Sequence, residues 1–235
     1  MSELTVALTV DCLCAAHEKC YVSGIVEAAE AEMTPCTWML GVSEHDPLSN
    51  VKLYHNEYIH RIPSWHELGL YLTFDTGVSN TVERGDLVRV GKDILKQFSI
   101  KPTAFRAANG DLEASDLKPL EDIGILVDST PGSNADRPLE APRSPYHPSY
   151  SMLHSPGEAK IWIAPVASVN GSKGYIDKGF DYVKPIIDLH LSSSNILALG
   201  MLDSVDNSEN LRHVVHYLKS KGARFVTLTQ LIADL

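Results

Sequence analysis

The sequence predicts an α/β fold, a distorted (β/α) barrel of seven or eight strand–helix units. Two observations support it: short apolar runs alternate with helical patterns along the chain, and polar residues recur where those runs end. Such alternation indicates parallel strands joined by helical crossovers. A chain of 235 residues is long enough for one barrel of this kind. We therefore expect a single barrel domain over residues 1–235.

Apolar alternation predicts four strands in the first half of the chain, the first of them rich in β-branched residues. Helical spacing of apolar residues over 25–32 ends at Pro35, and a second helical period covers 86–97. Residues 43–63 are polar and aromatic without a clear period, which predicts a loop with one short helix. The four strands are expected at residues 4–11, 36–40, 68–74 and 102–107.

The second half continues the alternation. Ser115 is expected to cap a helix that ends at Gly124. Residues 132–148 are rich in proline and polar side chains, which predicts a long surface loop. Apolar residues within 211–218 form the core stripe of a final long helix, and Thr229 is expected to cap a short terminal one. The strands of this half are expected at residues 125–128, 161–166, 196–201 and 225–228.

Composition and charge limit the classes of partner. Hydrophobic residues make up 44% of the chain and charged residues 21%, which is ordinary for a globular protein. The formal net charge of −10 argues against nucleic acid, whose phosphates need clustered Lys and Arg. The chain begins without a basic segment, and no apolar stretch is long enough for a membrane span. We expect a cytoplasmic protein with reduced cysteines.

Three of the four cysteines lie close together near the start of the chain. Cys12, Cys14, His17 and Cys20 offer thiolate and imidazole groups, which are zinc ligands. Their spacing matches no standard two-knuckle zinc pattern. Reduced cysteines that pack as small apolar residues are the favoured interpretation, and a zinc site is the alternative.

Short motifs follow one another in a fixed order. The most specific is Phe105-Arg106-Ala107 with the helix and strand segment that comes after it. Together the motifs resemble the polysaccharide deacetylase (NodB-like, carbohydrate esterase) family. The Pro145-Tyr146-His147-Pro148 stretch is most similar to the subgroup associated with surface-polysaccharide, lipopolysaccharide and O-antigen synthesis. The matching segments are residues 8–11, 36–39, 65–70, 105–107, 120–129 and 221–228.

The resemblance implies a metal-assisted hydrolysis of an acetamide. A divalent metal, typically zinc, polarises the carbonyl and activates a water molecule. A carboxylate accepts a proton, a histidine protonates the leaving amine, and an arginine holds the carboxylate. Carried over residue by residue, Asp11 matches the base and Arg106 matches the arginine.

Other family positions carry different residues here. Residues 12–14, Cys-Leu-Cys, follow Asp11 where the family has a metal-binding carboxylate. The two metal-binding histidines correspond to Tyr71 and Asp75, and the catalytic histidine corresponds to residues 202–203. An Asp, Tyr and Cys set is a poorer zinc site than one rich in histidine. The candidate metal ligands are Asp11, Asp75, Cys14 and His66, or there is no metal at all.

Three further residues are candidates for contact with a sugar. Trp65 and Tyr71 have an apolar ring face that could stack on a sugar ring, although core packing is an equal alternative. His147 lies in the Pro-rich loop, and loops over a barrel mouth often touch ligand.

Three interpretations of function follow. The first is a hydrolase of non-peptide carbon–nitrogen bonds with a rearranged centre, which deacetylates a saccharide in surface-polysaccharide (O-antigen) biosynthesis. The second is a catalytically inactive protein of the deacetylase fold that binds a saccharide. The third is a related conversion of a sugar amide. We favour an enzyme acting on a saccharide or its precursor, although fold alone does not establish function.

Overall fold

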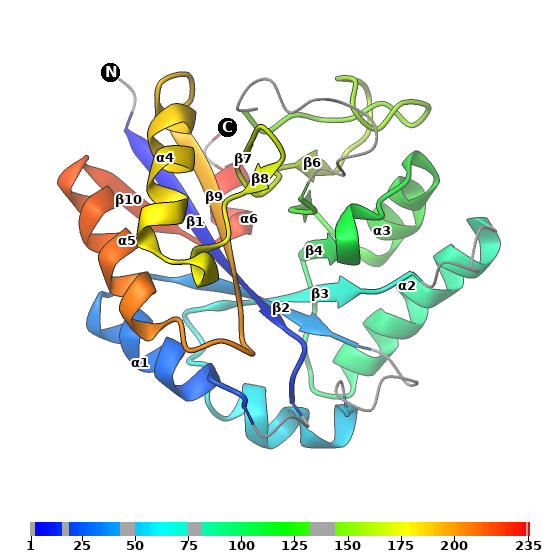
Figure 1. The fold of residues 1–235 in the computed structure, drawn as a ribbon. Coiled ribbons are helices and arrows are strands. Elements are labelled where there is room, and N and C mark those ends of the chain that lie inside the picture. Colours follow the sequence, from blue (N-terminus) through cyan, green and yellow to red (C-terminus); the bar gives the residue numbers. More distant parts are fainter. Residues whose placement is uncertain (1–2, 16–18, 43–49, 75–80, 132–143, 234) are drawn as a thin grey trace.

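The protein is represented by a computed structural model that describes residues 3–15, 19–42, 50–74, 81–131, 144–233 and 235. Eight strands form one parallel sheet in the order β10-β1-β2-β3-β4-β5-β6, with β9 also paired to β1. Helices surround the curved sheet (Figure 1). The strands are β1 Leu4–Cys12, β2 Cys36–Gly41, β3 Glu67–Leu72, β4 Ala104–Ala107, β5 Val127–Asp128, β6 Trp162–Ile163, β9 Ile196–Leu202 and β10 Ala223–Val226.

Strand β1 pairs with three other strands of the sheet. Along one edge it pairs with β9 over most of its length. Its first half pairs with β10, from Leu4 to Ala7, and its second half pairs with β2, from Leu8 to Cys12. This register places Asp11 beside Leu202, near the carboxyl ends of both strands.

The sheet closes through the segment that follows β6. Ala167 donates its backbone N–H to the carbonyl of Ala198, and Gly200 donates to the carbonyl of Gly174. Tyr175 forms a parallel bridge with Gly200. These bonds join the β6 side of the sheet to β9, so the predicted distorted (β/α) barrel is confirmed.

Six helices and several short helical turns cover the barrel in the part of the chain that the structure describes. In Figure 1, α1 and α5 lie on one side of β1, and α2 and α3 lie on the opposite side. The helices are α1 Val22–Ala31, α2 Thr81–Lys96, α3 Leu117–Ile123, α4 Phe180–Leu191, α5 Ser208–Ser220 and α6 Leu228–Ala233. The short elements are η2 Val51–Leu53, the π-helix η3 His55–Ile59, η4 Ala108–Gly110, η5 Ala114–Asp116, η6 Ile176–Lys178 and the β7–β8 hairpin of Ser168–Val169 and Ser172–Lys173.

The two faces of the sheet carry residues of different size. Val6, Leu8 and Val10 of β1 belong to the large apolar cluster that includes the buried residues of the helices. Ala7 belongs to a second, smaller cluster inside the barrel, in which several residues are alanine. Because successive strand residues point to opposite faces, Asp11 faces the interior with Ala7, and Cys12 faces the helices. Small interior residues leave room for the long side chain of Arg106.

The amino-terminal end of the barrel is closed by polar contacts. The carboxylate of Glu67, at the start of β3, accepts hydrogen bonds from the hydroxyls of Thr37 at 2.8 Å and Thr103 at 3.0 Å. It also accepts bonds from the backbone N–H and the hydroxyl of Thr229 in α6. Glu67 therefore ties three elements together at the end opposite to Asp11.

Four sequence expectations differ from the structure. Thr229 does not cap the terminal helix, because α6 begins at Leu228 and Thr229 lies inside it. Helix α2 begins at Thr81, five residues before the predicted start at residue 86. Helix α4 was not expected, because it contains Pro185, which lacks the N–H of a regular helix. Ser115 is not the cap of α3: the preceding turn carries a capping box of Glu113 and Asp116. The stop at Gly124 is confirmed, with a left-handed φ of 94°.

Candidate functional site

Asp11 and Arg106 form a buried ion pair inside the barrel. Asp11 is the last inward-facing residue of β1, and Arg106 lies on β4, 95 residues away in the chain. Arg106 Nη1 donates to Asp11 Oδ1, and the side chains are 0% and 3% exposed. This end of the strands is where barrels of this type carry their functional residues.

Further polar groups hold the guanidinium of Arg106 in place. Its Nε donates to the carbonyl of Ser129 at 2.9 Å, and its Nη2 donates to the hydroxyls of Thr9 at 2.7 Å and Ser129 at 3.1 Å. Thr9 in turn donates to the carbonyl of Leu199. Arg106 is therefore bonded to β1, to Asp11 and to the residue after β5, which leaves it little freedom to move.

Tyr175 completes the shell around Asp11. Its hydroxyl donates to Asp11 Oδ2 at 2.8 Å. The sequence analysis did not single out Tyr175, which is 164 residues from Asp11. The Asn170-Gly171 pair between β7 and β8 could have marked the hairpin that leads to it, since Asn-Gly is a strong hairpin signal. Both residues adopt positive φ, 48° and 77°.

The electrostatics of the site keep the guanidinium of Arg106 charged and the phenols of Tyr71 and Tyr175 neutral. Burial, the largest single influence, opposes the charge of Arg106, but the interactions with Asp11, Tyr175 and Tyr71 together raise the pKa of the guanidinium. Burial also raises the pKa of the Tyr71 phenol to about 12, with a further contribution from Asp11 and an opposing one from Arg106. Burial raises the pKa of Tyr175 as well. Both phenols are hydrogen-bond donors at neutral pH.

Among the described residues, those at the positions that the resemblance assigns to metal ligands and to the catalytic histidine do not gather into a metal site in the barrel interior. Cys12 faces the helices, away from the interior, and its thiol donates to the carbonyl of Val10. The Asp203 carboxylate also lies outside the interior, where it accepts a bond from Tyr58 of η3. Asp75 lies outside the described residues. Of the described candidates only Asp11 and Tyr71 face the interior, and two ligands are too few for zinc, so we derive no chemical step through such a metal.

His66 and Trp65 lie at the other end of the barrel from Asp11. His66 precedes β3, and its Nδ1 accepts the backbone N–H of Cys36 at 2.9 Å. Because the neutral ring then carries its proton on Nε2, it has no free lone pair for a metal. Burial lowers the pKa of His66 to about 4, which keeps the ring neutral. Trp65 packs against His66 with a centroid distance of 4.1 Å.

His147 lies near the start of β6. Its Nδ1 contacts the carbonyl of Ile161 at 3.1 Å, and its ring packs on Trp162 with centroids 3.9 Å apart. Trp162 pairs with Val127 at the first residue of β5. Of the candidate site residues, the structure therefore brings Asp11, Arg106 and Tyr71 together, and places Trp65, His66 and His147 elsewhere.

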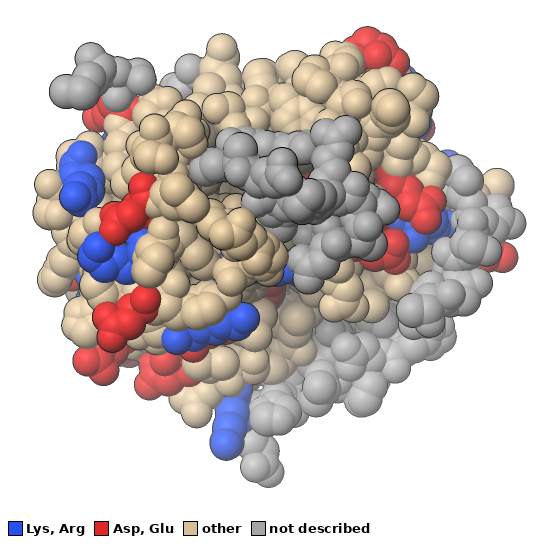
Figure 2. Space-filling model, turned by 45° about the horizontal axis from the view of Figure 1, so that its top comes forward, with Lys and Arg blue, Asp and Glu red and all other residues tan. Residues whose placement is uncertain are grey.

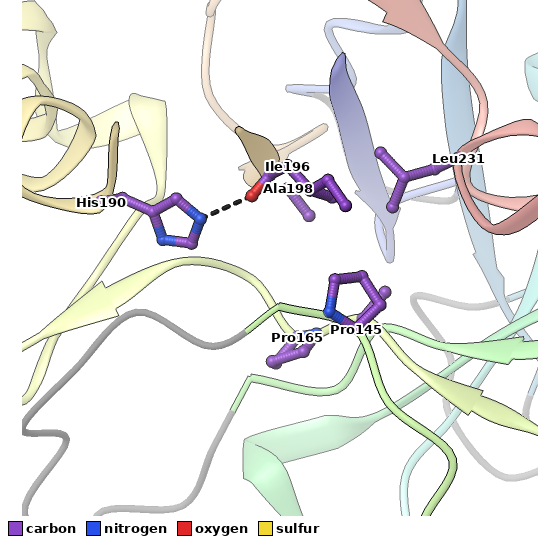
Figure 3. Close-up of a pocket in the computed structure, with 7 residues that line it drawn as sticks. Pro145, Pro165, His190, Ile196, Ala198 and Leu231 are labelled. Atoms are coloured by element: carbon purple, nitrogen blue, oxygen red, sulfur yellow. Dashed lines mark hydrogen bonds between the residues drawn. The ribbon is translucent and has the colours of Figure 1, made fainter. Parts of the chain in front are cut away.

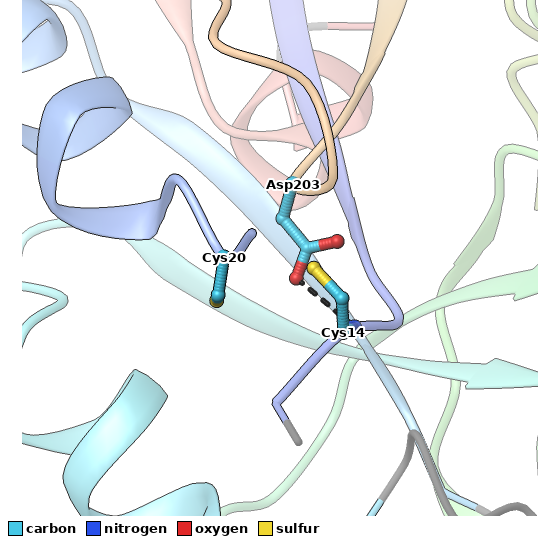
Figure 4. A group of neighbouring side chains, drawn as sticks. All are labelled: Cys14, Cys20 and Asp203. Carbon is cyan, nitrogen blue, oxygen red and sulfur yellow. Dashed lines mark hydrogen bonds between the residues drawn. The ribbon is translucent and has the colours of Figure 1, made fainter. Parts of the chain in front are cut away.

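A group of possible metal ligands lies on the outer side of the strand ends. Cys14, Cys20 and Asp203 place their ligand atoms within 4.8 Å of one another, the one group of three found among the residues that the structure describes. Figure 4 shows that they come from three segments: after β1, before α1 and after β9. Cys14 and Cys20 both belong to the zinc alternative named from the sequence, and Cys14 was also a candidate ligand at the deacetylase site; Asp203 was in neither set.

A small hollow lies at the amino-terminal end of the barrel. It is lined by apolar residues and by His190, whose Nε2 contacts the carbonyl of Ile196 at 2.6 Å (Figure 3). Ile196 is the first residue of β9, whereas Asp11 pairs with its last residue, Leu202. The hollow is therefore separate from the Asp11 site.

The surface at the top of Figure 1 carries charges of both signs. Turned toward the viewer in Figure 2, it shows basic groups beside acidic ones. Exposed ion pairs of the same kind join Lys184 to Asp188 within α4 and Lys219 of α5 to Glu32. Among the described residues, no helix is long and apolar enough to cross a membrane.

Comparisons with known proteins show which fold this chain has. No protein-family model and no curated protein matches this chain. Among solved structures, a candidate polysaccharide deacetylase from Mycobacterium smegmatis is similar with a TM-score of 0.66 and 12% identity, covering 100% of this chain and 91% of the other. The peptidoglycan deacetylase PdaC from Bacillus subtilis gives a TM-score of 0.58 and 14% identity, covering 99% and 91%.

A pseudoenzyme also has this fold. BA3943 from Bacillus anthracis, a CE4 family pseudoenzyme, is similar with a TM-score of 0.62 and 12% identity, covering 98% of this chain and 66% of the other. A mutant of BA3943 with restored enzymatic activity gives a TM-score of 0.61. At such identities the likeness shows the deacetylase fold of this chain, and its activity has to be argued from its own residues.

Proposed function

We propose that this protein acts on a saccharide and hydrolyses, or otherwise converts, an amide such as an acetamide on the sugar. The observation that supports this most is the Asp11–Arg106 pair inside the barrel, at the functional end of a deacetylase fold. Surface-polysaccharide or O-antigen synthesis is the biological setting that we propose, from the sequence resemblance.

The side chains have separate tasks in this proposal. Asp11 accepts the proton of the attacking water molecule and later gives it to the leaving amine, so that proton transfer is balanced. Arg106 and Tyr175 orient the two oxygens of Asp11. Tyr71, which stays protonated, donates a hydrogen bond to the carbonyl oxygen as charge develops there.

A second candidate is binding without turnover. It is favoured by the position of Cys12, which stands where the family has a metal-binding carboxylate and faces the helices instead. In this case the barrel mouth holds a saccharide, and the Asp11–Arg106 pair serves as a polar wall of the binding site.

One experiment separates the two candidates. Purified full-length protein is incubated with a panel of N-acetylated mono- and oligosaccharides, and acetate release and sugar binding are both measured. The proposal expects acetate release that falls at least about a thousandfold in Asp11→Asn, a loss typical of an essential proton-transfer group. Glu67→Gln, at the opposite end of the barrel, is the control for disturbed folding.

Each outcome decides between the candidates. Sugar binding without acetate release or another change in the sugar would reject the enzyme and support the binding protein. Neither binding nor release with any member of the panel would contradict both.

A further inference from the structure

We propose that Cys14, Cys20 and Asp203 form a structural site for a thiophilic divalent cation such as Zn²⁺. Two thiolates and one carboxylate are a ligand set that zinc accepts. The site lies between the barrel and the helices, whereas Asp11 faces the barrel interior, so this proposal does not depend on the proposed function.

The distances support a shared ion. The three ligand atoms lie within 4.8 Å of one another. In a tetrahedral zinc site, bonds of about 2.0–2.3 Å place neighbouring ligand atoms about 3.3–3.8 Å apart. Small side-chain rotations can close this difference. Three protein ligands leave one position of the tetrahedron for water or another group.

The carboxylate of Asp203 is already oriented by its neighbours. Its Oδ1 accepts the backbone N–H of Leu13 at 3.1 Å, and its Oδ2 accepts the N–H of Cys14 at 3.4 Å. The hydroxyl of Tyr58 also donates to Oδ2 at 2.8 Å. Outer contacts of this type commonly fix ligands at metal sites. The Cys14 thiol also interacts with this carboxylate, so a thiolate and a carboxylate oxygen are already neighbours where the cation would bind.

Cys12 and Cys36 lie outside the group of three and are fully buried. The thiol of Cys14, which also donates to the backbone carbonyl of Lys19 at 3.7 Å, lies beside Cys20 and Asp203. Cys12 is fully buried, and its thiol donates to the carbonyl of Val10. Cys36 is fully buried at the start of β2 and contacts the carbonyl of Thr34. Cys20 is half-buried and Cys14 is 4% exposed, so the proposed site has a route to solvent on the Cys20 side. Cys36 is therefore a suitable control position.

A bound cation would join three segments of the chain. It would link the end of β1 to the start of α1 through Cys20, and to the end of β9 through Asp203. The backbone N–H of Asp203 also donates to the carbonyl of Asp11 at 3.1 Å. The cation would thus support the strand ends that carry Asp11 without contacting its carboxylate.

The test uses full-length protein purified under reducing conditions without chelators. We expect about one zinc ion per chain by elemental analysis, and tetrahedral Co²⁺ absorption with a thiolate charge-transfer band after exchange. Cys14→Ser, Cys20→Ser and Asp203→Asn should each weaken binding at least tenfold, and Cys36→Ser should retain it. Tyr58→Phe should weaken it about tenfold, because it removes an outer contact of Asp203.

Three results would contradict the proposed zinc site. Absence of a stoichiometric metal together with no thiolate band on adding Co²⁺ would contradict it. Equal binding by wild type and the correctly folded Asp203→Asn variant would also contradict it. A Cys14–Cys20 disulfide in freshly purified protein that takes up no metal would replace it with a covalent link. Loss of acetate release alone would bear on the proposed function and not on this site.

Discussion

Two buried ion pairs in this protein differ in their surroundings. Arg84 of α2 and Asp116 meet through two parallel bonds, Nε to Oδ1 at 2.8 Å and Nη2 to Oδ2 at 2.6 Å. Arg106 contacts only one oxygen of Asp11, and the hydroxyl of Tyr175 occupies the other. The first pair is bidentate, and Arg84 donates further bonds to the carboxylate and the backbone carbonyl of Asp111. In the second pair one carboxylate oxygen accepts the hydroxyl of Tyr175, a neutral group that a substrate could replace.

The two ion pairs also lie in different parts of the fold, Arg84–Asp116 between helices and Arg106–Asp11 inside the barrel. Asp116 also accepts the backbone N–H of Glu113 in the capping box before α3, and the Arg84 guanidinium packs on the ring of Phe74 at 3.8 Å. These contacts serve packing between α2 and α3. Burial of an ion pair is therefore no sign of function by itself, and the position of Asp11 inside the barrel is the stronger argument.

Removal of either arginine should have the largest effect on stability. Arg84→Met and Arg106→Met should each lower the free energy of unfolding by about 3–5 kcal/mol, because each leaves a buried carboxylate unpaired. Urea unfolding measures this loss. Adding Asp116→Asn to the first variant, or Asp11→Asn to the second, should recover part of it.

The same variants should differ in function. Folded Arg84→Met with Asp116→Asn should keep acetate release or sugar binding, and Arg106→Met with Asp11→Asn should lose acetate release. If both double variants behave alike in these assays, the comparison between the two pairs fails.

The carboxylate of Asp128 is also buried, but no arginine donates a hydrogen bond to it among the described contacts. It therefore shows how a buried carboxylate behaves without a direct ion pair. Burial raises the pKa of Asp128 to about 7 from 3.8, although two bonds from Thr130 and the charge of Arg106 oppose this. Between about pH 4 and 7 the unfolded chain loses this proton while the folded protein keeps it. Stability should therefore fall by up to about 4 kcal/mol as pH rises through this window.

Asp128→Asn should remove this part of the pH dependence, because asparagine does not ionise. The check is urea unfolding of both proteins at several pH values from about 4 to 8. An identical slope in wild type and variant would show that Asp128 is ionised in the folded protein at neutral pH.

Loss of the Tyr175 hydroxyl should have a moderate effect. Tyr175→Phe removes a hydrogen bond to a buried carboxylate, which should cost about 2 kcal/mol of stability and lower acetate release. Tyr217→Phe is the matched control, since its hydroxyl contacts the exposed Asp188. Equal effects of the two substitutions would argue that Tyr175 has no special role at Asp11.

An exposed ion pair should have the smallest effect. Lys184 and Asp188 lie one turn apart on α4, and both side chains are 41% exposed. Lys184→Ala should leave the urea midpoint of unfolding unchanged within experimental error, because water and salt screen such pairs. A clear drop in that midpoint would show that α4 depends on this pair, contrary to the contrast with the buried ones.

Much of the fold could be predicted from the sequence because its signals are local. The alternation in β1 and the apolar stripe of α5 each depend on a few consecutive residues, and both elements are present. The long α4 helix was missed because Pro185 breaks the local helical signal, while tertiary packing of its buried face favours the helix.

The candidate site was predictable only in part. The ordered motifs suggested that Asp11 and Arg106 belong to one site, and the structure places them in contact. The alternation of β1 already implied that Cys12 faces away from Asp11, so Cys12 could not replace the family's metal-binding carboxylate beside it. Asp203 directly follows β9, so its place at the strand end was predictable, but its contacts with residues 13 and 14 depend on long-range topology. Tyr175 reaches Asp11 in the same way, and only the Asn170-Gly171 hairpin before it gave a local signal.

The most direct test of the central claim is a crystal structure of the Asp11→Asn variant soaked with an N-acetylated oligosaccharide. We predict electron density for the sugar at the carboxyl ends of the strands, with its acetamide next to Tyr71 and to the substituted side chain at position 11. A sugar found only at the amino-terminal hollow beside His190, or a barrel interior too closed to admit one, would contradict it.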